Sequence, residues 1–192
     1  MERENPMSGK NAEERVVPSP EDKGVYLFMS EVSQETCKDL ISFILTKSWS
    51  SPRPKALQII INSPGGDLSA AFAVIDIMKG CPIPVHTTGL GQIASAGFMI
   101  FIAGEKGHRV LTPNTSIMSH QFSWGSWGKE HELVAVGKEF ELTTERMLSH
   151  YKKCTGLNEK QIRQYLLPAT DVWLGAREAK KLGICDSVKD IK

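Results

Sequence analysis

Residues Ala56–Asp67 read ALQIIINSPGGD, an apolar run that ends in a glycine-containing turn. A continuous run rich in β-branched residues is typical of a parallel strand buried on both faces, here over Ala56–Ile61. The glycines Gly65 and Gly66 let the backbone turn with positive φ or approach a ligand closely. A helix is expected from about Leu68 to Lys79, so the segment predicts one strand–turn–helix unit.

The same alternation continues on both sides of this unit and predicts an α/β fold. Right-handed β-α-β connections at these short intervals imply a largely parallel sheet. A helix at about Glu130–Lys153 is long for such a domain, and we expect it to project and pack against another subunit. The remaining elements are expected as strands at Val25–Met29, Val85–Thr88, near Val110 and at Ser116–Ser119, a helix capped by Ser33, a turn over 89–92, a helix at about Ala94–Ala103, and a closing helix and strand with Gly183 as a C-cap.

Length and composition predict one folded domain behind an N-terminal arm. The chain has 192 residues, and a domain typically takes roughly 150. Residues 1–23 are rich in charge and proline and poor in apolar side chains, so we expect a flexible arm there. The domain is therefore expected to span residues 24–192.

Charge and cysteine usage exclude several classes of function. The net charge is +1, which gives no electrostatic reason to expect nucleic acid or an anionic membrane as partner. The four cysteines form no C-x-x-C pair and no histidine pair has zinc-ligand spacing, so no metal site is expected. No apolar segment is suitable for a signal peptide or a membrane span, and we expect a cytoplasmic protein with reduced thiols.

Ser95 is a candidate nucleophile. It stands in Gly91-Gln92-Ile93-Ala94-Ser95-Ala96-Gly97, among small residues at the start of an apolar helix. Unpaired N–H groups at a helix N-terminus can hold an oxyanion beside such a serine. The segment is not the G-x-S-x-G elbow, because Ile93 stands at the first glycine position. Helix capping by Ser95 is an equally good interpretation of this segment alone.

A serine hydroxyl needs a base, and the base needs an orienting carboxylate. His120 ends the apolar run Ile117-Met118-Ser119-His120-Gln121, and none of the other histidines has a comparable setting. A lone histidine is more often structural. Spacing alone cannot choose the carboxylate, for which the candidates are Asp67, Glu105, Asp171 and Asp186.

Over residues 55–190 the chain resembles the Clp protease proteolytic subunit. Three of the segments quoted above resemble its glycine turn, its nucleophile segment and its histidine segment, in that order. Residues 169–174 (ATDVWL), followed by Glu178-Ala179 and residues 182–188 (LGICDSV), resemble its C-terminal stretch with the catalytic aspartate. The resemblance implies a crotonase-like core, a superhelix of β-α-β units with a projecting handle helix.

Carried over residue by residue, the resemblance implies a serine endopeptidase that forms an acyl-enzyme. Ser95 would attack, His120 would act as base, and Asp171 would hold the histidine. The N–H groups of Gly66 and Ala96 would form the oxyanion hole. An extended peptide would bind along the segment after the histidine, with substrate-binding residues Gly65, Gln121, Phe122, Ser123, Trp124 and Gly125.

The resemblance also implies partners. Seven subunits would form a ring, and two rings would stack into a tetradecamer that encloses a chamber for polypeptide substrates. This chain would bind no cofactor, because ATP would be used by a partner unfoldase of the AAA+ Clp type. Docking to such an unfoldase is less well supported, because Gln58 and Ile60 stand where the family commonly carries aromatic residues.

Three other functions remain open. The chain could be a non-catalytic ring subunit that co-assembles with active ones, although Ser95, His120 and Asp171 are all present. It could act on acyl-CoA thioesters, a chemistry that needs no serine–histidine pair. It could also be a peptidase for one specific process such as capsid maturation, and the unusual N-terminal arm would suit that role.

Overall fold

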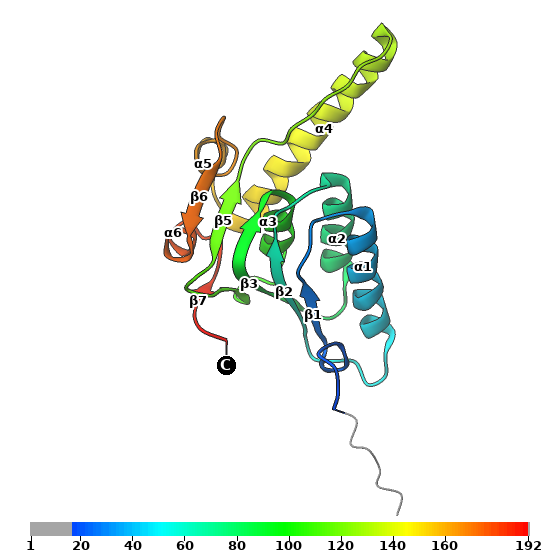
Figure 1. The fold of residues 1–192 in the computed structure, drawn as a ribbon, viewed down its shortest axis with the longest axis vertical. Coiled ribbons are helices and arrows are strands. Elements are labelled where there is room, and N and C mark those ends of the chain that lie inside the picture. Colours follow the sequence, from blue (N-terminus) through cyan, green and yellow to red (C-terminus); the bar gives the residue numbers. More distant parts are fainter. Residues whose placement is uncertain (1–16, 192) are drawn as a thin grey trace, which may run out of the picture.

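Seven strands form one sheet in the computed structural model, which describes residues 17–191 (Figure 1). Five neighbouring strands are all parallel: β1 (Val25–Phe28), β2 (Leu57–Ser63), β3 (Val85–Ala94), β4 (Arg109–Leu111) and β7 (Ser187–Val188). The strand β5 (Ser116–Ser119) pairs in parallel with the end of β3, and β6 (Val172–Gly175) pairs antiparallel with β5. The predicted α/β fold with a largely parallel sheet is confirmed.

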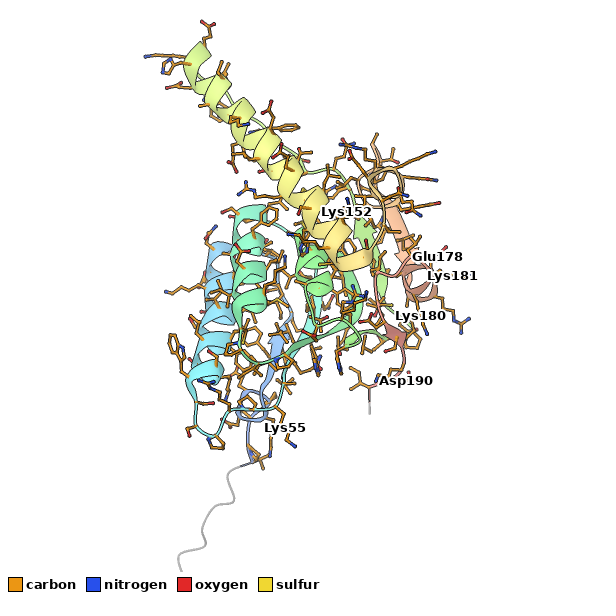
Figure 2. All side chains as sticks on the ribbon, turned by 180° about the vertical axis from the view of Figure 1, so that it is seen from behind. Lys55, Lys152, Glu178, Lys180, Lys181 and Asp190 are labelled. Atoms are coloured by element: carbon orange, nitrogen blue, oxygen red, sulfur yellow. The ribbon has the colours of Figure 1, made fainter. Side chains whose placement is uncertain are left out.

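The helices gather mainly on one face of the sheet. In the view from behind, α1, α2 and α3 lie in front of the strands, and their apolar sides form the core with the sheet (Figure 2). The predicted cap of α1 is present, because Ser33 accepts from Thr36 N–H. Asp67, which the sequence analysis did not identify as a cap, accepts from Ala70 N–H at the start of α2. The helical elements are η1 (Glu21–Lys23), α1 (Gln34–Trp49), α2 (Leu68–Gly80), α3 (Ser95–Ile102), α4 (Glu130–Thr155), α5 (Glu159–Tyr165) and α6 (Ala176–Lys181).

The strand β2 is buried on one face only, so the expectation of burial on both faces is wrong. Its residues alternate between fully buried, as at Ile59 and Ile61, and half-buried, as at Gln58 and Ile60. The helices cover one side of the sheet, and nothing in residues 17–191 fully covers the other at this strand. An isoleucine run therefore does not show by itself how many faces are covered.

The strand β3 runs on through residues 89–92, where the sequence predicts a turn. Its first half pairs with β4 and its second half with β5. The pairing of β3 with β2 shifts register between Ile61 and Ser63, as it does at a β-bulge. At Gly89 a Cβ would meet side-chain atoms of Ile93 and Leu111, so glycine is needed inside this strand.

The handle helix α4 projects from the body, as predicted (Figure 1). Its buried residues all lie in the C-terminal half, between Thr143 and Tyr151. Along this helix Met147 and Tyr151 are buried, whereas the apolar side chains of Leu133 and Phe140 are 43% and 46% exposed. The N-terminal half of the handle therefore presents apolar side chains to solvent in this single chain.

The ends of the chain differ in detail from the predictions. Most of the predicted arm, residues 1–16, lies outside the described residues, and Glu21–Lys23 forms a single 3-10 turn. The sequence reading missed α5, although Asn158 and Gln161 form a capping box at its start. Gly183, with φ 71°, lies one residue beyond the C-cap Leu182, the usual place for a left-handed glycine.

Candidate active site

Strand pairing brings the three predicted side chains together. Ala94 on β3 is the register partner of Met118 on β5, so Ser95 and His120 both leave the sheet at the same edge. Ser119 on β5 is in turn the partner of Val172 on the antiparallel strand β6. Because β5 and β6 are antiparallel, the residue after Ser119 lies opposite the residue before Val172. This places Asp171 beside His120.

The three side chains form a continuous array. His120 Nε2 lies 2.9 Å from Ser95 Oγ, and His120 Nδ1 lies 3.4 Å from Asp171 Oδ1. A carboxylate on the Nδ1 side favours the tautomer with the proton on Nδ1, which leaves Nε2 free to accept from the serine hydroxyl. The Asp171 side chain is 60% exposed and its contact is longer than a direct hydrogen bond.

The other three candidate carboxylates have different surroundings. Asp67 caps α2, and Asp186 forms an ion pair with Arg109 at 2.7 Å. Glu105 donates its N–H to Val85 O at the start of β3, the end of that strand remote from Ser95. Of the four candidate carboxylates, Asp171 is the one that lies beside His120.

Ser95 has an unusual backbone conformation. Its φ is 50°, and among the described residues it is the only non-glycine residue with positive φ. Such a conformation costs of order 1–3 kcal/mol and is concentrated at functional sites. Because Ser95 is the first residue of α3, the N–H of Ala96 belongs to the first helical turn, which has no carbonyl partner within the helix.

Gly65 and Gly66 run close to this serine. A Cβ on Gly65 would lie 2.6 Å from Ser95 Cβ, and both glycines have positive φ, 94° and 145°. Val32 fixes the turn from the other side, since its N–H donates to Gly65 O and its carbonyl accepts from Asp67 N–H, both at 2.8 Å. In this parallel bridge the N–H of Gly66 points away from Val32, and Gly66 lines the same cleft as Ser95.

Asp67 anchors the residue next to that turn. Its Oδ1 accepts from Ala70 N–H at 3.0 Å and its Oδ2 accepts from Gln34 Nε2 at 2.9 Å. These hydrogen bonds favour the ionised form and hold the pKa of Asp67 below its usual range. A negative charge is therefore fixed at the mouth of the cleft at neutral pH.

An open cleft of about 370 Å³ runs past the array. Of the predicted substrate-binding residues, Phe122, Ser123 and Trp124 line it, whereas Gly65 packs behind Ser95. Gln121 instead donates to Leu167 O at 3.2 Å, and Gly125 is not among the lining residues. The full lining is Gly66, Asp67, Leu68, Ser69, Ser95, His120, Phe122, Ser123 and Trp124.

Sequence reasoning missed Val32, Leu68 and Ser69 as parts of this site. Val32 is joined to the turn only by a long-range bridge, which no local pattern reveals. Leu68 and Ser69 were read as the start of a helix, and the signal available was their position directly after the glycine turn.

The described part of the chain contains neither a cluster of metal ligands nor a helix that could span a membrane. Over residues 17–191, no three His, Cys, Asp or Glu side chains are grouped so that they could hold a metal ion. None of the helices described there combines the length and the apolar character needed to cross a membrane.

Comparison with known proteins gives one consistent family. The sequence profile described as Clp protease matches residues 20–192. The chain is 34% identical over 159 residues to "ATP-dependent Clp protease proteolytic subunit 1" of Corynebacterium jeikeium, which covers 83% of each chain. It is 34% identical to subunit 2 of Corynebacterium glutamicum, over 83% of this chain and 78% of that protein. It is 30% identical to subunit 2 of Treponema denticola, over 84% of this chain and 80% of that protein.

Proposed function

Because the chain belongs to the Clp protease family, we propose that it is a serine endopeptidase that cleaves polypeptides through an acyl-enzyme. The observation that carries this proposal is the 2.9 Å contact between His120 Nε2 and Ser95 Oγ, with Asp171 on the other ring nitrogen. A nucleophile, a base and an orienting carboxylate in this order have the geometry of a serine-hydrolase triad.

In the acylation step, Ser95 Oγ attacks the scissile carbonyl while His120 Nε2 takes the hydroxyl proton. Negative charge develops on the carbonyl oxygen, and the N–H groups of Gly66 and Ala96 would donate to it. His120, now a cation stabilised by Asp171, gives its proton to the leaving amine. The products of this step are the Ser95 ester and the released amine.

In the deacylation step, His120 takes a proton from water as the water attacks the ester. The tetrahedral intermediate collapses, the acid product leaves, and the proton returns to Ser95 Oγ. Every group needed for these steps comes from side chains and backbone N–H groups of this chain, so ATP would be used only by a partner unfoldase.

Assembly into stacked heptameric rings is part of the proposal. The exposed apolar side chains on the outer half of α4 support it, because a projecting helix with such a surface is suited to packing against another subunit. Polypeptides would be cleaved in the enclosed chamber, after delivery by an AAA+ unfoldase. The four cysteines are all unbridged, which supports a reducing compartment such as the cytoplasm.

A second candidate is a ring subunit without activity of its own. The observation that favours it is the 3.4 Å separation of His120 Nδ1 from an Asp171 side chain that is 60% exposed. A carboxylate held this loosely would orient the histidine weakly in the single chain.

The test is the mass of the intact protein after incubation with a fluorophosphonate. One adduct on the wild type and none on Ser95→Ala would support the peptidase. Equal labelling of both proteins would refute Ser95 as nucleophile. An unlabelled wild type would favour the inactive subunit.

A further inference from the structure

The cleft beside Ser95 has two chemically different walls. One wall, from the start of α2, carries Asp67, Leu68 and Ser69. The other, from the segment after His120, carries Phe122 and Trp124, whose rings meet edge to face with centroids 6.0 Å apart. A bound residue next to the scissile bond therefore meets apolar surface, aromatic rings and one carboxylate.

The carboxylate of Asp67 keeps unused hydrogen-bonding capacity. An ionised carboxylate offers about four lone-pair sites, and Asp67 uses one on each oxygen, toward Ala70 N–H and Gln34 Nε2. Asp67 is exposed on the surface of the cleft, so a ligand can reach it. Its partners are both neutral, and neither cancels its charge.

The cleft itself offers Asp67 no basic partner. The residues that line the cleft include no lysine or arginine. Arg146 lies over the ring of Phe72 on α2, but its guanidinium is bonded to Glu139. The helix dipole of α2 offsets part of the Asp67 charge, yet a dipole end carries only about half a unit charge.

We propose that the cleft selects peptides with a lysine or arginine side chain beside the scissile bond, with the cationic head paired to Asp67. This inference rests on the proposed peptidase function. The aliphatic stem of such a side chain packs on Leu68 and Trp124 while its head stays near water, as amphipathic side chains do. The aromatic face adds a cation–π attraction for the same head.

The experiment compares two peptidyl diphenyl phosphonates that differ in one side chain, lysine or norleucine. Norleucine has the same four-carbon stem without the ammonium group, so the pair isolates the charge. The rate of adduct formation at Ser95 is followed by intact mass at low salt. We expect the lysine probe to react about tenfold faster with the wild type.

Asp67→Asn is the decisive variant, because asparagine also caps a helix well. The ratio of the two rates is expected to fall to near one, and a ratio cancels losses common to both probes. Asp67→Ser keeps a capping oxygen and is used if Asp67→Asn is unstable. Asp39→Asn, which removes an exposed carboxylate outside the cleft, is expected to leave the ratio unchanged.

The possible failures are distinguishable. Absence of any Ser95 adduct with both probes overturns the peptidase and the inference together. Adducts with both probes at equal rates, or a faster norleucine probe, overturn the inference alone. A lysine preference that survives in both Asp67 variants overturns the role of Asp67.

Discussion

His150 on the handle helix donates from Nε2 to the carbonyl oxygen of Met99 on α3, at a distance of 2.9 Å. This bond fixes the tautomer, because the proton on Nε2 leaves Nδ1 as an acceptor for Lys79 Nζ at 3.3 Å. His150 is 3% exposed. A buried hydrogen bond therefore joins the helix that begins at Ser95 to the helix that projects from the body.

The first prediction concerns the pH dependence of folding. Burial, with Lys79 adding a positive charge nearby, lowers the pKa of His150 to about 4 from its ordinary 6.5. The unfolded chain then binds more protons between these values, so His150 contributes stability above pH 6.5 that is lost as the pH falls toward 4. The loss is at most about 3 kcal/mol. Urea unfolding at pH 7 and pH 5 measures it.

His150→Gln is the matched variant for this prediction, because glutamine can donate to Met99 O without titrating in this range. Its stability is expected to change less between pH 7 and pH 5 than that of the wild type. An identical loss in both proteins would show that other groups cause the pH dependence.

The second prediction compares two glycines in helices. A Cβ on Gly97 of α3 would lie 2.8 Å from Ser63 Cβ, whereas a Cβ on Gly137 of α4 meets nothing within 4 Å. Gly97→Ala should push α3 from β2, lowering both the melting temperature and the labelling rate of Ser95. Gly137→Ala should stabilise by about 1 kcal/mol through helix propensity. Calorimetry that shows the same sign for both would contradict this account.

The third prediction concerns the ion pair of Arg109 and Asp186. Arg109 is 2% exposed and binds Asp186 through Nε and Nη2 while Nη1 donates to Cys154 O. Arg109→Lys loses this two-point contact with Asp186. It should lower the free energy of unfolding, measured with denaturant, by about 3 kcal/mol. Arg163→Lys, in an exposed pair with Glu159, should cost less than about 1 kcal/mol. Equal costs would refute the structural importance of the buried pair.

The fourth prediction tests assembly through the handle. Val134 is 69% exposed on the projecting half of α4. Val134→Lys should reduce the mass measured by light scattering at micromolar concentration, because the charge would be buried between subunits. His131→Lys, on the same half, is the control for added charge. A monomeric wild type would exclude the proposed ring, and an unchanged mass in Val134→Lys would exclude this residue from the interface.

The sequence by itself predicted most of the helices and strands and two of the candidate site residues. Local patterns predicted the helices α2 and α4 close to their observed bounds. They also singled out Ser95 and His120 as candidates, because a serine among small residues at a helix start and a histidine ending a strand are local features. Such features depend on propensities and spacing within a few residues, which sequence contains directly.

Only the tertiary structure decided what lies beside what. The antiparallel register of β5 and β6, a pairing across more than fifty residues, places Asp171 beside His120. No such pairing places Glu105 or Asp186 there. Val32 contacts the glycine turn through another bridge between residues far apart in the sequence. Strand register and sheet coverage depend on how distant surfaces pack, so a local window of sequence contains neither. The same reason explains why the run of isoleucines in β2 predicted a strand but not its half-exposed face.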